Sequence, residues 1–250
     1  MLTTNDIVIR FGGLTAVDHV SLHVAPNTIT GLIGPNGAGK TTLFNAISGV
    51  YTPSEGSIVF NEKHIEGMRP FQINKVGMCR TYQVINLFRK MTVLENVVVG
   101  MHSELKAGFF SSVLRTKRER EEEMAAYEKA YQWLEFAGIE SYANDLAGSL
   151  PYGKQRLLEI VRALASNPQL VLLDEPAAGM NSAEKAEFDK LLKKIVDQGF
   201  TVLMIEHDMR LVMGVCDYVY VLEYGKLLAE GTPEEVQCNP EVIRAYLGGE

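Results

Sequence analysis

The sequence lacks any apolar stretch long enough to cross a membrane, and it has few cysteines. No uninterrupted hydrophobic run approaches the ~18 residues that a membrane-spanning helix needs. Cys79, Cys216 and Cys238 are the only cysteines, and none lies in a CxxC spacing, which argues against a zinc site and a disulfide framework. The first ten residues also lack the long apolar segment of a secretory signal, so we expect the chain to stay in the cytoplasm.

An excess of positive charge is missing as well. The chain has 24 lysines and arginines against 31 aspartates and glutamates, which gives a net charge of -7 at pH 7. Such a chain is not expected to present a broad surface for nucleic acid, although a single phosphate pocket needs only local positive potential. What the chain does hold is 46% hydrophobic residues over 250 positions, enough for one large domain or for a core with an inserted subdomain.

A phosphate-binding loop is the most specific motif. The mostly apolar run 28–33 predicts a buried strand, and helix-like spacing begins at Thr41. Between them the sequence matches G-x-x-x-x-G-K-[ST], with Gly34, Pro35, Asn36, Gly37, Ala38, Gly39, Lys40 and Thr41, followed by Thr42. Backbone N–H groups of such a loop wrap phosphate oxygens, Lys40 can reach the β- and γ-phosphates, and the Thr41 hydroxyl can bind Mg²⁺. A plain glycine-rich turn would need neither Lys40 nor Thr41, so we predict a nucleotide site.

Two carboxylates end a second buried strand. The apolar run 170–173 leads directly into Asp174 and Glu175. At the carboxyl edge of a parallel sheet, Asp174 would meet the Mg²⁺ of the phosphate-binding loop, and Glu175 would orient or deprotonate an attacking water. Solvated acids at a strand end are the alternative interpretation, and the phosphate-binding loop favours the metal and base roles.

The strand and helix patterns divide the chain into a core and a helical insertion. Alternation at Val20, Leu22 and Val24 indicates an antiparallel strand, whereas apolar runs after position 168 alternate with helical spacing and indicate a parallel sheet. We therefore predict an α/β fold, a P-loop NTPase core with a mixed sheet that includes an antiparallel β portion. The predicted ATP-binding core comprises residues 1–85 and 166–250, and the predicted helical subdomain comprises residues 86–165.

Together these motifs resemble those of the ATP-binding subunits of ABC transporters over essentially the whole chain. Residues 150–155, Leu-Pro-Tyr-Gly-Lys-Gln, stand in the place of the family's LSGGQ motif. Gln83 and His207 match two further family motifs, and the order of all the motifs along the chain is the family's order. The resemblance implies an ATPase that uses ATP and Mg²⁺.

The resemblance also implies catalytic and metal-binding roles. Thr41, Gln83 and Asp174 would serve the Mg²⁺, and Gln83 would link the metal and the attacking water to the helical subdomain. Glu175 would be the catalytic base, and His207 would contact the γ-phosphate. Without the resemblance, Gln83 would more simply cap a strand and His207 would have a local structural role.

Two apolar residues match the family's adenine contacts. Phe11 stands where the family stacks an aromatic ring on adenine, and Val17 matches the apolar residue beside it. The alternative for Phe11 is a place in the hydrophobic core, because an aromatic near a strand end is more often core than ligand contact.

The segment 150–155 departs from the family pattern. Pro151 replaces the usual serine and Tyr152 replaces a glycine, so the serine hydroxyl contact to the ATP of the opposite subunit cannot be made. The backbone N–H of Gly153 and the N-terminus of the following helix remain for that phosphate. Lys154, in place of glutamine, would add charge there or would be a solvated first-turn lysine.

A second departure follows Pro176, where Asn181 stands in place of the family's aspartate. Asn181 followed by Glu184 reads as a helix N-cap with a capping box. A contact from Asn181 to the ATP of the opposite subunit is the alternative role.

The segments LPYGKQ, DEPAAGMN and NPEVIRAYLGGE resemble the ATPase subunits of branched-chain amino-acid importers, and residues 103–117 resemble an insertion of that subfamily. This resemblance implies uptake of branched-chain or similar hydrophobic amino acids. ATP would lie between this chain and a second, identical or homologous, ATPase subunit. Two permease subunits would hold the pair at the cytoplasmic face of the membrane, and an external solute-binding protein would act through the permeases.

Two alternatives stay open. One is the ATPase of a lipid exporter or other exporter, which would share this architecture. The other is a soluble ABC-type factor that acts on ribosomes or nucleic acid. The acidic composition and the single ATPase unit argue against the second alternative, and no nucleic-acid partner is expected.

Overall fold

The computed structural model describes residues 1–101 and 117–247, so most of the insertion-like segment 103–117 lies outside the described residues. The chain forms two compact units. The first comprises Met1–Gln83, Gln169–Ala178 and Lys185–Glu250, and the second comprises Val84–Pro168 and Gly179–Glu184. The predicted core and helical subdomain differ from these units by a few residues at each boundary, and they did not assign the short piece Gly179–Glu184 to the helical unit.

The first unit contains two sheets. The antiparallel sheet has the order β2-β1-β4-β5 and consists of β1 (Leu2–Phe11), β2 (Leu14–Val24), β4 (Glu55–Phe60) and β5 (Lys63–His64). The second sheet has the order β10-β9-β3-β8-β7-β6 and consists of β3 (Ile29–Ile33), β6 (Met78–Arg80), β7 (Leu170–Asp174), β8 (Thr201–Ile205), β9 (Tyr218–Glu223) and β10 (Lys226–Gly231). All its pairs are parallel except β9 with β10. The predicted mixed fold with an antiparallel portion is confirmed.

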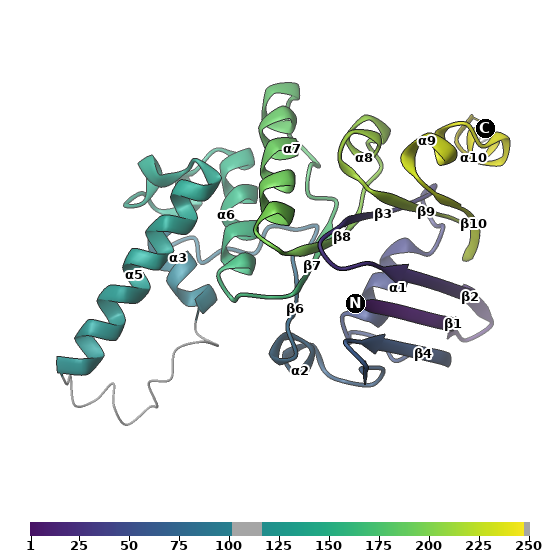
Figure 1. The fold of residues 1–250 in the computed structure, drawn as a ribbon, viewed down its shortest axis with the longest axis horizontal. Coiled ribbons are helices and arrows are strands. Elements are labelled where there is room, and N and C mark those ends of the chain that lie inside the picture. The colour runs from purple at the N-terminus through teal and green to yellow at the C-terminus, as the bar shows by residue number, and fades with distance from the viewer. Residues whose placement is uncertain (102–116, 248–250) are drawn as a thin grey trace. The chain divides into compact units, whose positions relative to one another are not determined.

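Helices cover both faces of the six-stranded sheet (Figure 1). α1 (Lys40–Ile47) lies between the two sheets, where Leu43, Phe44 and Ile47 join the hydrophobic core. On the opposite face are α8 (Met209–Val215) and α9 (Pro233–Gln237). The remaining helices of this unit are α2 (Pro70–Lys75), α10 (Pro240–Leu247) and most of α7 (Ser182–Asp197). β3, β7 and β8 are buried along their whole length, as expected for strands covered on both faces.

The second unit is helical in its described residues. Its helices are α3 (Val93–Gly100), α5 (Lys117–Ala137) and α6 (Tyr152–Leu164), with the 3₁₀ turns η2 (Glu140–Tyr142) and η3 (Ala147–Ser149) between them. The start of α3 is fixed by a capping box, in which Thr92 Oγ1 accepts from the Glu95 N–H at 3.1 Å and Glu95 Oε2 accepts from the Thr92 N–H at 2.7 Å. These helices contact one another through α3 and α6 and through α3 and α5.

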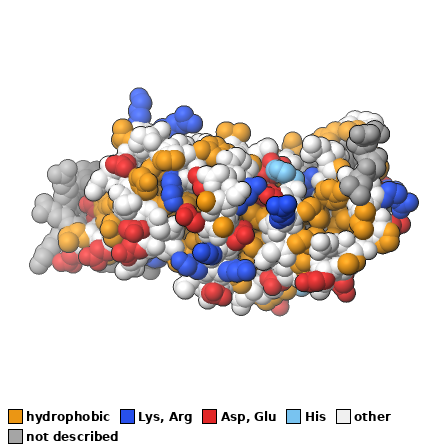
Figure 2. All heavy atoms as spheres, turned by 90° about the horizontal axis from the view of Figure 1, so that it is seen from above, with side chains coloured by type: hydrophobic (Ala, Val, Ile, Leu, Met, Phe, Trp, Pro, Cys, Tyr) orange, Lys and Arg blue, Asp and Glu red, His pale blue; other side chains and the backbone are white. Residues whose placement is uncertain are grey.

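Across residues 1–101 and 117–247, no helix is both long enough and apolar enough to span a bilayer. The face drawn in Figure 2 carries acidic and basic side chains intermixed, with hydrophobic side chains scattered between them.

Candidate nucleotide site

The phosphate-binding loop lies where the sequence predicts it, between β3 and the start of α1. Gly34, Gly37 and Gly39 have φ values of 145°, 80° and 99°, in the region that favours glycine. A Cβ on Gly34 would lie 2.1 Å from the Leu222 carbonyl oxygen, and one on Gly39 would lie 2.6 Å from that of Ala16. Close backbone approach therefore requires glycine at both positions.

Lys40 begins α1 and is buried against its own loop. Its Nζ donates to the carbonyl oxygens of Gly34 at 2.7 Å and Pro35 at 2.8 Å. Burial lowers the pKa of Lys40, while the nearby negative charges of Glu175 and Asp174 act in the opposite direction. The ammonium group thus lies near Asp174, the predicted metal ligand, and Glu175, the predicted catalytic base. Thr41 is exposed and Thr42 is half-buried, beside Lys40 in the first turn.

Asp174 and Glu175 follow one another at the carboxyl end of β7. Asp174 ends the strand, and Glu175 adopts a left-handed φ of 46°. The Glu175 N–H donates to the Ile205 carbonyl at 3.0 Å, and its own carbonyl accepts from the Ala178 N–H at 3.1 Å. A non-glycine residue in this conformation costs about 1 to 3 kcal/mol and is typical of functional sites. The backbone contacts on both sides of Glu175 hold it there.

Three predicted catalytic side chains meet at one carboxylate oxygen. Gln83 Nε2 donates to Glu175 Oε2 at 2.9 Å, and His207 Nδ1 lies 3.9 Å from the same oxygen. The His207 side chain is largely exposed, whereas that of Glu175 is mostly buried. Residues from three distant parts of the sequence therefore gather around a potential proton acceptor.

Asp174 has a partner that the sequence analysis did not identify. Arg80, the last residue of β6, donates from one terminal nitrogen to Asp174 Oδ2 at 2.8 Å. Each of the two side chains is only 6% exposed. In the sequence, Arg80 is marked only as a basic residue three positions before Gln83.

Glu206 is a second functional candidate that the sequence analysis missed. Its Oε1 accepts from the Ala177 N–H at 2.8 Å, and its Oε2 accepts from the His207 N–H at 3.1 Å. Burial raises the pKa of this carboxyl, and the backbone hydrogen bonds partly oppose that rise. Glu206 thereby links the loop after Pro176 to His207.

The two predicted adenine contacts have different surroundings. Phe11 is 45% exposed and packs edge-to-face on Tyr51 with ring centres 5.2 Å apart, so it lies outside the core and can offer a face to a base. Val17 is fully buried within the hydrophobic core. A Cβ on Gly39 would lie 3.5 Å from Val17 Cγ2, so Val17 packs beneath the loop. Because its side chain has no exposed surface, the expected base contact of Val17 is not supported.

The segment 150–155 forms the start of α6 in the second unit. Pro151 is the N-cap residue, Pro151 and Tyr152 are exposed, Gly153 is buried, and Lys154 is half-buried. A Cβ on Gly153 would lie 2.4 Å from Glu184 Oε1, and one on Gly179 would lie 2.8 Å from Tyr152 Cε1. The segment therefore packs closely on residues 179–184. A side chain at Gly153 would displace Glu184 of the same subunit before it affected a neighbouring subunit.

Asn181 caps α7 as the sequence predicts. Its Oδ1 accepts from the N–H groups of Ala183 at 2.9 Å and Glu184 at 3.0 Å, and Glu184 Oε2 accepts from the Asn181 N–H at 2.9 Å. The capping box of Asn181 and Glu184 is confirmed.

The predicted metal ligands offer only oxygen atoms, which is the donor set that Mg²⁺ prefers. They are the Thr41 hydroxyl, the Asp174 carboxylate and the Gln83 amide oxygen. Among the described residues, no group of three or more His, Cys, Asp or Glu side chains could hold a metal ion. One carboxylate fits Mg²⁺, because Mg²⁺ is usually bound by one or two carboxylates together with phosphate oxygens and water.

Comparison with known proteins places this site in a family. A family model described as "ABC transporter" matches residues 17–178, and one described as "Branched-chain amino acid ATP-binding cassette transporter" matches residues 226–250. The chain belongs to the ABC transporter family. It is an ABC ATPase, and its fold is that of a nucleotide-binding cassette.

Curated relatives extend the similarity over almost the full length of this ABC ATPase. It is 49% identical to the high-affinity branched-chain amino acid transport ATP-binding protein LivG of Salmonella typhimurium, over 99% of this chain and 98% of that protein. It is 43% identical to the corresponding protein BraF of Pseudomonas aeruginosa, with the same coverage of both chains.

A solved cassette supports the fold directly. A nucleotide-free ATP-binding cassette from an ABC transporter shares 35% identity and a TM-score of 0.86, covering 100% of this chain and 99% of that one. A cassette solved in its ADP conformation gives the same identity, TM-score and coverage.

Proposed function

We propose that this ABC ATPase hydrolyses ATP in the presence of Mg²⁺ and thereby powers the import of branched-chain or similar hydrophobic amino acids. The convergence of Gln83 and His207 on Glu175 Oε2 carries the enzymatic part of the proposal. The substrate class is supported by the names of the curated relatives and by the match at residues 226–250. These names also favour branched-chain amino-acid transport over the lipid-exporter and nucleic-acid alternatives.

The phosphates would be bound by the loop and by Lys40. The Lys40 ammonium, which contacts the carbonyls of Gly34 and Pro35, would turn to the β- and γ-phosphates. Thr41, Gln83 and Asp174 would hold Mg²⁺. When bound, this ion neutralises charge that develops on the phosphoryl oxygens.

The water-activating step would fall to Glu175. Its carboxylate would accept a proton from the attacking water, and the hydrogen bond from Gln83 would fix the orientation of Oε2. His207 would donate to the γ-phosphate from its exposed position. Phe11 would stack on adenine through its exposed ring face.

A second ATPase subunit would complete the site. The N-terminus of α6 is formed by exposed Pro151 and Tyr152, buried Gly153 and half-buried Lys154. Backbone N–H groups and the helix dipole at this position favour a phosphate of the opposite subunit's ATP. Because the Asn181 Oδ1 is occupied by the cap of α7, a contact from Asn181 to that nucleotide would use its side-chain nitrogen.

The remaining partners are membrane and external proteins. Two permease subunits would provide the path across the membrane and hold the ATPase pair at its cytoplasmic face. An external solute-binding protein would deliver the amino acid to the permeases.

Replacing Glu175 with glutamine tests the enzymatic proposal. Glu175→Gln keeps the shape of the side chain but cannot accept the proton, so we expect ATP turnover to fall about 10² to 10⁴-fold while ATP binding is retained. A phosphate-release assay measures turnover and equilibrium dialysis measures ATP binding, so the two effects are measured separately. The matched control is Glu62→Gln in the exposed β4–β5 turn, which should leave both unchanged. Near-normal turnover of Glu175→Gln would remove Glu175 from its proposed role.

A further inference from the structure

Arg80 occupies a central place in the first unit. It ends β6, which runs parallel to β7 with Arg80 opposite Leu172, and the Thr81 N–H donates to the Leu172 carbonyl at 2.9 Å. This register places the Arg80 side chain beside the end of β7, two residues beyond Leu172, where Asp174 lies. The resulting contact to Asp174 Oδ2 is therefore set by the pairing of the two strands.

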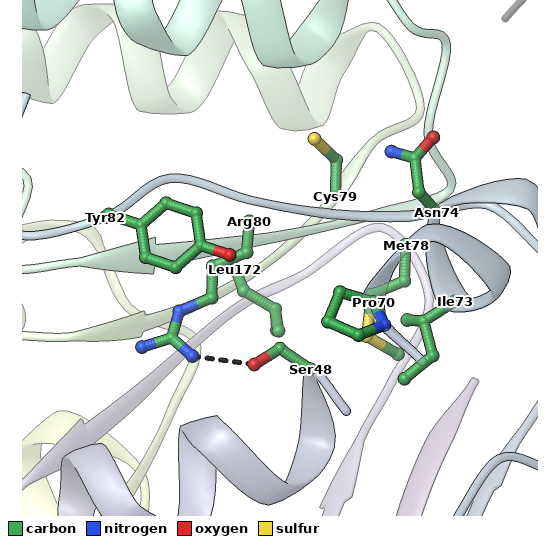
Figure 3. A pocket seen from close by; sticks show the side chains of 9 residues that line it. All are labelled: Ser48, Pro70, Ile73, Asn74, Met78, Cys79, Arg80, Tyr82 and Leu172. Atoms are coloured by element: carbon green, nitrogen blue, oxygen red, sulfur yellow. Dashed lines mark hydrogen bonds between the residues drawn. The ribbon is translucent and has the colours of Figure 1, made fainter. Parts of the chain in front are cut away.

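The same guanidinium reaches α1. Its second terminal nitrogen donates to Asn45 Oδ1 at 2.8 Å and to Ser48 Oγ at 2.6 Å. Asn45 lies in α1 and Ser48 is the C-cap residue of that helix. Figure 3 shows the Arg80 side chain extending towards Ser48, with Tyr82 beside it. The two ends of one planar group thus bridge α1 and the end of β7.

Aromatic rings flank the guanidinium. Its central carbon lies 5.1 Å from the ring centre of Tyr82 and 5.7 Å from that of Phe44. On another side is a cavity of about 140 Å³, whose lining includes Ser48, Met78 and Leu172 (Figure 3). Because packing is incomplete on that side, the polar and cation–π contacts hold the arginine in place.

These contacts join the three elements that carry the proposed Mg²⁺ ligands. Thr41 belongs to α1, which Arg80 contacts through Asn45 and Ser48. Gln83 directly follows Tyr82, whose ring the guanidinium stacks against. Asp174 is bonded directly. A buried ion pair is by itself weak grounds for a stabilising role, because desolvation of both charges offsets their attraction.

We propose that Arg80 is a positioning residue for the metal site: it fixes the Asp174 carboxylate and the Gln83 segment relative to α1, so that the three ligands meet one Mg²⁺. The proposal rests on the proposed ATPase function. Arg80 would have two opposite effects on the affinity of the site for Mg²⁺. Positive charge beside Asp174 would by itself weaken cation binding, whereas correct placement of the ligands strengthens it. The proposal states that placement dominates.

Metal affinity of the nucleotide complex tests the proposal. Mn²⁺ serves as the probe, and its binding to the full chain with a non-hydrolysable ATP analogue is measured by electron paramagnetic resonance. We expect Arg80→Gln to weaken Mn²⁺ binding about 10 to 100-fold, the range found when supporting residues of metal sites are removed. Binding of the analogue in EDTA should change little, because the polar contacts of Arg80 go to α1 and Asp174 and not to the phosphate-binding loop.

Further variants keep the test independent of folding. Arg80→Lys should lie between wild type and Arg80→Gln, because an ammonium can bond Asp174 but cannot bridge to α1 and stack on Tyr82 in the same way. Asn45→Ala removes one contact to α1 and leaves the ion pair, and it should weaken Mn²⁺ binding by a smaller factor. The control is Arg210→Gln, at an exposed position of α8, which should match wild type.

The outcomes separate this proposal from the proposed function. If wild type shows metal-dependent binding and well-folded Arg80→Gln binds Mn²⁺ as tightly or more tightly, the role of Arg80 is overturned. The proposed function is then unaffected. Absence of metal-dependent nucleotide binding in wild type would instead overturn the proposed function.

Discussion

At the scale of single residues, the Oε2 atom of Glu175 is the point on which the proposed chemistry depends. Gln83 bonds it directly and His207 lies near it, although these residues are far apart in the sequence. The left-handed backbone of Glu175 is held by hydrogen bonds to Ile205 and Ala178. The site therefore has a prearranged carboxylate, which reduces the reorganisation needed when the water is activated.

Phe11 provides a prediction about nucleotide affinity at this scale. Its exposed ring should stack on adenine, so Phe11→Ala should cost about 1 to 3 kcal/mol of binding free energy, and Phe11→Tyr should retain affinity. Titration with a fluorescent ATP analogue labelled on the ribose measures the affinities of both variants. Leu14→Ala, at the exposed position paired with Phe11 in the same hairpin, is the control. Equal affinities of wild type and Phe11→Ala would exclude the stacking role.

The sequence singles out residues that belong to a local motif. Lys40 and Thr41 follow a glycine loop, and Asp174 and Glu175 follow an apolar strand, so their spacing indicates their chemistry. Arg80 and Glu206 belong to no such pattern. Their partners are Asp174, Asn45 and Ala177, which come close only through strand pairing and loop packing. A single sequence does not reveal those distances.

At the scale of elements, Glu206 connects the end of β8 to the loop after Pro176. Burial raises its pKa above the ordinary value of 4.5, so the folded state binds a proton more readily than the unfolded chain. Stability should therefore fall as the pH rises from about 4.5 through the raised pKa of the folded state, and it should level off above that pKa. Below about pH 4.5 both states are protonated. The contribution of Glu206 to stability is then fully present and no longer changes with pH.

The Glu206→Gln variant tests this sign, because glutamine does not titrate. The free energy of unfolding of wild type, minus that of Glu206→Gln, should decrease as the pH rises through this window. Urea unfolding between pH 4.5 and 8 gives the difference, with Glu62→Gln as a control whose difference from wild type should stay flat. A difference that grows with pH would mean that hydrogen bonds to the carboxylate outweigh its burial.

Elements with strong local signals were predicted well. Asn181 begins α7 with the capping box that the sequence predicts, and Thr92 and Thr232 begin α3 and α9 with capping boxes of the same type. The three-residue strand β6 carries no such signal, because so short a run cannot show periodicity. The grouping of residues 179–184 with the helical unit also escapes the sequence, since Gly179 and Glu184 lie beside Tyr152 and Gly153 of α6 only in the folded chain.

At the scale of the whole molecule, the proposed ATPase site would drive transport through other proteins. The described residues include no helix that could span a bilayer, and the curated relatives are named as transport ATP-binding proteins. The proposed import assigns the energy source to this chain and the solute path to permeases. Loss of ATP binding should abolish uptake even when every other component is present.

Uptake of radiolabelled leucine into cells of the source organism shows whether this chain powers amino-acid import. Cells without the gene for this chain are complemented with wild type or with Lys40→Ala, which removes the charge proposed to bind the β- and γ-phosphates. At matched protein levels, wild type should restore saturable leucine uptake that unlabelled isoleucine and valine compete with, and Lys40→Ala should restore none. Equal uptake by the deletion strain and both complemented strains would contradict the proposal that this chain powers branched-chain amino-acid import.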